Sequence, residues 1–161
     1  EYVIVGHSER RTMFGDNEVA VAKKVAATFR NGMKPLLCVG ENAKERTEGK
    51  TARKISMQIN NAFKGLQAEQ AKEVVVAYEP LWAIGSGQAA TAKDAQEVCH
   101  LIREKLTKMF GEKISRQVRI LYGGSVNQNN AGTFKISGID GVLVGGASLN
   151  AQAFSSIVRS F

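Results

Sequence analysis

Cysteines, long apolar runs and runs of basic residues are all scarce in this sequence. Its 161 residues include two cysteines, Cys38 and Cys99, and neither has the spacing of a metal ligand. Two thiols are too few for the disulfide framework of a secreted domain, so we expect both to be reduced packing residues of a cytoplasmic protein. Because no apolar stretch reaches the roughly 18 residues of a membrane span, we expect no membrane anchor, and no signal peptide either.

The basic residues outnumber the acidic ones but are dispersed. The 22 Lys+Arg and 15 Asp+Glu give a net charge of +7, which suits nucleic acid, an anionic membrane or small acidic substrates. The densest groups, such as Arg10-Arg11 and Lys23-Lys24, are pairs, and aromatic residues make up only 7%. We therefore expect no nucleic-acid or membrane partner, and we attribute most of the charge to solvated helix faces.

Short apolar segments alternate with amphipathic helical segments along the chain. The predicted strands cover residues 2–6, 35–40, 74–79, 118–124 and 141–146. Helices are expected at about 17–30, from the low fifties to near Gly65, from an N-cap at Thr91, and at about 151–158, with room for one brief helix between the last two strands. Continuous apolar strands are typical of parallel sheets covered on both faces. The pattern predicts an α/β fold of five βα units, forming a single domain over residues 1–161.

Polar residues and glycines follow the predicted strands at their carboxyl ends. The first strand is followed by the segment 6–9, the second by Gly40-Glu41-Asn42, the fourth by residues 123–125 and the fifth by Gly145-Gly146, while the third ends at Glu79. In parallel βα architectures these strand ends share one rim, which carries the active site.

Glu79 is the candidate general base. Burial at a strand end raises the pKa of a carboxyl group and suits it to accept a proton. The loop that follows has apolar residues to exclude water and glycines to act as hinges: Leu81, Trp82, Ile84, Gly85 and Gly87. The alternative is an ordinary surface loop in which Glu79 pairs with a basic residue.

His7 is the candidate electrophile, because a neutral imidazole N–H can stabilise a developing enolate oxygen. The alternative is an ordinary structural histidine, the interpretation we adopt for His100. Ser125, Gly145 and Gly146 suit a phosphate, since their backbone N–H groups can approach an anion closely just before a helix begins. Glycines that merely turn the chain are the alternative.

The motifs "GHSERR", "CVGE", "AYEPLWAIGSG", "YGGSV" and "LVGGASL" occur together from Gly6 to Leu149, and the chain resembles the triosephosphate isomerase family over essentially its whole length. That family is an established example of a Glu base, a neutral His electrophile and a closing lid. The resemblance implies a (β/α)8 TIM barrel and interconversion of dihydroxyacetone phosphate and glyceraldehyde 3-phosphate through an enediolate, in glycolysis and gluconeogenesis, by a homodimer without metal or organic cofactor. It implies that His7 is the electrophile and Glu79 the base, with Glu9 as a supporting carboxylate. It also implies that the substrate phosphate is bound by Gly85, Ser125, Gly145 and Gly146.

The resemblance covers only part of the family's barrel. An eight-stranded barrel has about 250 residues, and the five predicted strands match strands four to eight. The family's phosphate-binding lysine and its main dimer contact belong to the absent first three strands, and "NAK" at 42–44 follows the wrong strand to replace that lysine. The chain starts within a strand. We therefore expect that a preceding segment would complete the barrel. Three interpretations stay open: the C-terminal part of an ordinary isomerase, an anion-binding fragment without turnover, or a non-enzymatic interaction module.

Overall fold

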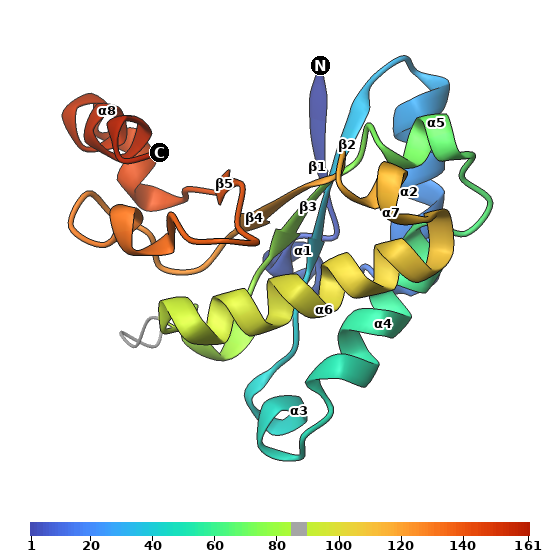
Figure 1. Ribbon diagram of the computed structural model, residues 1–161, viewed down its shortest axis with the longest axis horizontal. Coiled ribbons are helices and arrows are strands. Elements are labelled where there is room, and N and C mark those ends of the chain that lie inside the picture. The colour runs from blue at the N-terminus through green and yellow to red at the C-terminus, as the bar shows by residue number, and fades with distance from the viewer. Residues whose placement is uncertain (85–89) are drawn as a thin grey trace.

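A single sheet of five parallel strands organises the computed structural model, which describes residues 1–84 and 90–161 (Figure 1). The strands are β1 (Tyr2–Val5), β2 (Lys34–Val39), β3 (Val75–Tyr78), β4 (Arg119–Tyr122) and β5 (Gly141–Val142). Their order in the sheet follows their order in the chain, and each pairs in parallel with the next. The prediction of five parallel strands is confirmed. The last two are shorter than expected, because the chain leaves the ladder before the glycine pairs.

Helices follow the strands in the order that βα units require. The α-helices are α1 (Ser8–Met13), α2 (Glu18–Arg30), α3 (Ala43–Thr47), α4 (Thr51–Ala62), α5 (Ala68–Ala71), α6 (Ala92–Phe110), α7 (Glu112–Ser115) and α8 (Ala151–Arg159). Three short 3-10 helices are η1 (Leu81–Ala83), η2 (Ala131–Phe134) and η3 (Gly146–Leu149), and η2 is the brief helix expected between β4 and β5. In the described parts of the chain, no helix has both the length and the apolar character needed to cross a membrane.

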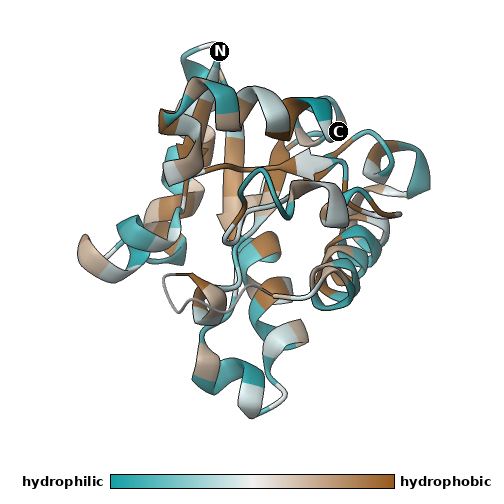
Figure 2. Ribbon diagram, turned by 90° about the vertical axis from the view of Figure 1, so that its left-hand side faces the viewer, coloured by the Kyte–Doolittle hydropathy of each residue, from teal (hydrophilic) through white to brown (hydrophobic). Residues whose placement is uncertain are grey.

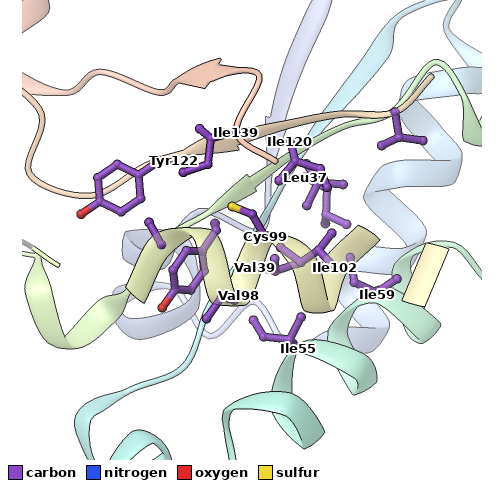
Figure 3. Packing of buried hydrophobic residues seen from close by; sticks show 14 of the residues in the cluster. Leu37, Val39, Ile55, Ile59, Val98, Cys99, Ile102, Ile120, Tyr122 and Ile139 are labelled. Carbon is purple, nitrogen blue, oxygen red and sulfur yellow. The ribbon is translucent and has the colours of Figure 1, made fainter. Parts of the chain in front are cut away.

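The core lies between one face of the sheet and helices α2, α4 and α6 (Figure 3). Val5, Leu37, Val76 and Ile120 are paired in register across four strands, so their side chains share this face. From the helices, buried aliphatic side chains meet them: Ile55, Ile59, Val98 and Ile102. Burying each such side chain stabilises the fold by about 1.5–3 kcal/mol, and this layer fixes the sheet that carries the strand-end residues.

The opposite face of the sheet is partly open, which corrects the expectation that all strands are covered on both faces. Tyr2 and Ile4 of β1 are 46% and 52% exposed, and Leu36 of β2 is half-buried. The apolar strands appear near the centre of Figure 2. Helices α2, α4 and α6 contact these strands and bury their core face. Apolar residues in these strands therefore did not imply cover on both faces.

Side chains of β1 and β4 contact each other across the open face of the sheet. Arg119 of β4 donates a hydrogen bond to the hydroxyl of Tyr2 on β1 at 2.5 Å, and its guanidinium lies 5.7 Å from the centre of that ring. Two strands separate β1 from β4, so a flat sheet would place them about 14 Å apart. These two long side chains meet across the open face and span the strands that lie between them.

Candidate functional site

A cavity of about 450 Å³ lies at the carboxyl ends of the strands. Its lining comes from the segments after β1, β3, β4 and β5: His7, Ser8, Glu9, Glu79, Gly123, Gly124, Ser125, Gly145 and Gly146, with Ile4, Ile84, Val126, Leu143 and Val144. The structure thus brings together six of the seven residues singled out as candidates from the sequence. The seventh, Gly85, lies outside the described residues, as does the hinge candidate Gly87.

His7 and Glu79 contact each other directly at this cavity. The Nε2 atom of His7 lies 3.0 Å from Oε1 of Glu79. His7 is also the N-cap of α1, and its Nδ1 accepts the backbone N–H of Glu9 at 3.3 Å. An Nδ1 atom that accepts a hydrogen bond carries no proton, so the ring proton of a neutral His7 is on Nε2. The imidazole therefore presents an N–H donor to the cavity side.

Glu79 is a buried carboxyl group, with only 2% of its surface exposed. Burial raises its pKa above the ordinary value because desolvation disfavours the charged form. The nearby His7 and the N–H of Ser8, which donates to Oε2 at 2.9 Å, act in the opposite direction. Such a carboxylate is a stronger base than an exposed one and is suited to accept a proton.

The phosphate candidates line the same cavity from the β4 and β5 side. Gly145 and Gly146 are exposed, and a Cβ atom built on either would meet nothing within 4 Å. Open space therefore remains beside their backbone, at the start of η3. The hydroxyl of Ser125 donates to the carbonyl of Ala83 at 3.2 Å, which ties the β4 end to the segment after Glu79. Glu9 is exposed at the cavity edge.

Glu41 is a buried residue. The sequence placed it on the rim formed by the carboxyl ends of the strands but suggested no role for it. Its Oε1 accepts hydrogen bonds from the Tyr78 hydroxyl and from Nε1 of Trp82, both at 3.0 Å, and lies 3.4 Å from Arg46. Arg46 also stacks over the Trp82 ring at 4.5 Å. Trp82, predicted to cover the site, is held here by Glu41 and Arg46. The available signal was a carboxylate directly after Gly40, the glycine that follows β2.

Potential metal-ligating side chains are dispersed in the described parts of the chain. Across residues 1–84 and 90–161, no three His, Cys, Asp or Glu side chains gather closely enough to hold an ion. Asn42 of the "NAK" segment forms a capping box with Glu45 at the start of α3, and each side chain accepts the other residue's backbone N–H. Both cysteines are buried and free, and burial raises the pKa of Cys99 to about 12.

Comparison with known proteins gives the same family along the whole chain. The family model described as triosephosphate isomerase matches residues 1–161. The chain is 50% identical over 160 residues to the triosephosphate isomerase of Acetivibrio thermocellus and 48% identical over 160 residues to that of Carboxydothermus hydrogenoformans, covering 99% of this chain and 64% of each relative. For the Saccharopolyspora erythraea protein the identity is 49% over 157 residues, covering 97% of this chain and 60% of the relative. The chain thus spans less than two thirds of the length of these relatives, and its parallel strands form part of a TIM barrel. It belongs to the triosephosphate isomerase family.

Proposed function

We propose that this chain, joined to a segment that supplies the missing strands of the barrel, interconverts dihydroxyacetone phosphate and D-glyceraldehyde 3-phosphate. The observation that carries the proposal is the His7–Glu79 pair at 3.0 Å, beside open backbone at Gly145 and Gly146. A base, a hydrogen-bond donor and an anion-accessible backbone face one cavity, and an aldose–ketose proton transfer needs these three groups.

In the proposed reaction, Glu79 removes a proton from the carbon next to the substrate carbonyl. The Nε2–H of His7 donates to the carbonyl oxygen and stabilises the negative charge of the enediolate. Glu79 then returns the proton to the neighbouring carbon, while His7 passes its Nε2 proton to the former carbonyl oxygen and takes up the proton of the neighbouring hydroxyl, which becomes the new carbonyl. Because the two side chains bond to each other in this structure, the substrate oxygen must take the place of the carboxylate at Nε2. Glu9 supports this end of the cavity, and Gly85, Ser125, Gly145 and Gly146 bind the phosphate.

The test is a chimera in which the N-terminal part of the Acetivibrio thermocellus enzyme precedes Glu1. In a coupled isomerase assay, the chimera should turn over triose phosphate, and the 161-residue chain alone should show little or no activity. Glu79→Asp in the chimera withdraws the carboxylate by about one methylene, and a misplacement of about 1 Å costs on the order of a hundredfold in kcat. We expect KM to change much less.

A Glu79→Ala chimera controls for contaminating host enzyme. Near-normal kcat in the Glu79→Asp chimera would show that Glu79 is not the proton acceptor. A chimera that folds and binds a phosphate analogue but has no activity above the Glu79→Ala background would favour the second candidate function, a partial barrel that binds anions or a partner without turnover. The 52% exposure of Ile4 on the open face of the sheet is the observation that favours this second candidate.

We also propose that the complete protein is a cytoplasmic homodimer. The support for the dimer is an exposed apolar pair at the end of α1, Met13 at 72% and Phe14 at 63% exposure. Light scattering on the chimera should give the mass of two copies, whereas a single-copy mass would contradict the dimer.

A further inference from the structure

Strand β2 continues past the end of its neighbour β1. The last paired residues are Val5 and Leu37, after which the chain beyond β1 turns away into α1. Cys38, Val39 and Gly40 thus have a strand on only one side. Val39 uses its carbonyl on that side, where it accepts the N–H of Glu79 at 2.8 Å. Because successive backbone groups of a strand point to opposite sides, the carbonyl of Cys38 and the N–H of Gly40 face the side where β1 has ended.

Two side chains supply the partners that β1 does not. Oε1 of Gln58, from α4, accepts the N–H of Gly40 at 2.8 Å. The guanidinium of Arg11, from α1, donates to the carbonyl of Cys38 at 3.3 Å and to that of Gly6 at 2.7 Å. Gln58 is 1% exposed, and Arg11 is fixed in turn by Glu18 at 3.0 Å. Buried backbone groups without partners are costly, so these side chains stabilise the extended course of β2 up to Gly40.

The end of β2 in turn holds the backbone of Glu79. Glu79 and Leu81 donate their N–H groups to Val39 and Glu41, at 2.8 Å and 3.1 Å. Between these two bonds, Gly40 presses against Glu79 so closely that an added Cβ would lie 1.7 Å from the Glu79 carbonyl oxygen. A shift of Gly40 is therefore transmitted to the Glu79 backbone.

We propose that Gln58 and Arg11 are positioning residues that replace β1 along the end of β2 and so fix Glu79 opposite His7. The inference rests on the proposed function for the role of Glu79. The geometric link from Gln58 through Gly40 to Glu79 stands on the contacts alone. Gln58 lies in α4, outside the cavity lining, so it acts through Gly40.

The test uses the chimera with two substitutions at one position. Gln58→Met keeps the length of the side chain but removes the acceptor, whereas Gln58→Glu keeps an acceptor oxygen. Thr28→Val is the matched control, because Thr28 is also buried and its hydroxyl donates to a helix carbonyl, that of Lys24, away from the strand ends. These three variants and Arg11→Met are compared by kcat, KM, unfolding and amide hydrogen exchange.

For Gln58→Met we expect kcat to fall about ten- to a hundredfold with KM nearly constant, because a misplaced base slows the chemical step. Amide exchange at Glu79 should accelerate about tenfold relative to core amides of α6, as one lost hydrogen bond implies. Gln58→Glu should recover kcat relative to Gln58→Met, and Arg11→Met should reproduce the kcat loss. Thr28→Val should lower stability without lowering the kcat of the folded enzyme.

Unchanged kcat and unchanged Glu79 exchange in Gln58→Met would overturn the inference, and so would equal kcat losses in Thr28→Val and Gln58→Met. If the chimera proves inactive, the proposed function fails, yet the exchange of the Glu79 amide still decides whether Gln58 fixes that residue. The two failures are therefore distinguishable.

Discussion

Burial of the Glu79 carboxyl group has a consequence for stability as well as for proton transfer. Its pKa is raised in the folded state by desolvation, and the adjacent His7 only partly offsets this effect. Between the ordinary carboxyl value of about 4.3 and the raised value, the folded state therefore binds more protons at this residue than the unfolded state does. By linkage, the contribution of Glu79 to the free energy of unfolding falls as the pH rises through this window.

Glu79→Gln should remove that dependence. The free energy of unfolding is measured for the parent and for the Glu79→Gln chimera at each pH from 4 to 8. The parent value minus the Glu79→Gln value should decline as the pH rises and then level off. Urea unfolding provides the measurement. A difference that rises with pH would mean that the bonds from His7 and Ser8 outweigh burial and that the pKa of Glu79 is lowered instead.

The single residues of the site were largely identifiable from the sequence, because each follows an apolar strand. His7 and Glu79 were predicted to share a rim, and the structure places them 3.0 Å apart. Gln58 was not found, because a glutamine on an amphipathic helix gives no sign that its oxygen reaches a strand end 18 positions away. Glu41 was noticed only as part of the rim. Long-range hydrogen bonds of this kind depend on packing that local sequence patterns do not encode.

Among the elements, helix α6 begins at a capping box that can be recognised in the sequence. Thr91 accepts the N–H of Asp94 through its hydroxyl, and Asp94 accepts the N–H of Thr91, both at 3.1 Å. In a third hydrogen bond, the Thr91 hydroxyl donates to the Asp94 carboxylate at 2.6 Å. The predicted N-cap is thereby confirmed, and this capping box begins the longest helix on the core face.

Thr91→Ala should lower the free energy of unfolding by about 1 kcal/mol, within the 0.5–2 kcal/mol typical of N-cap losses. Thr91→Ser should retain most of the stability because it keeps the acceptor oxygen. Chemical denaturation of the chimera at neutral pH measures both. Equal losses in the two variants would show that the methyl group, not the cap, stabilises this helix start.

Elements with strong periodicity were predicted well, and short ones were not. Helix α2 was expected at 17–30 and spans Glu18–Arg30 after its N-cap Asn17. Four shorter helices, α1, α3, α5 and α7, were missed, since four to six residues carry too little periodicity to recognise. The exposure of β1 was also missed, because apolar composition does not reveal whether the second face of a sheet has a cover.

At the scale of the whole molecule, the open face of the sheet and the exposed apolar residues of α8 are the main unpartnered surfaces. Ile4 is 52% exposed on the sheet, and Phe154 and Val158 are 42% and 59% exposed on α8. Exposed apolar patches and unpaired strand edges favour association. These surfaces are where the segment that completes the barrel would pack.

The isolated 161-residue chain should therefore self-associate. Size-exclusion chromatography with light scattering should show species larger than the 17.4 kDa chain at micromolar concentration. Ile4→Asp should reduce the association because it places a charge on the open face, whereas Val19→Asp, a 61% exposed control on α2, should not. A strictly monomeric chain with one sharp, cooperative unfolding transition would contradict this prediction.

The strand order of the sheet also bears on how such a chain is made. Each strand pairs only with the strands immediately before and after it in the sequence. During synthesis, each newly emerged βα unit can therefore dock on the unit already formed, without waiting for distant parts of the chain. The one pairing that must wait is ring closure, which joins the first strand of a barrel to its last. A chain with fewer βα units would lose this closing step but keep the pairing between all of its adjacent strands. In the same way, an array of stacked repeats keeps its remaining interfaces when a terminal repeat is removed.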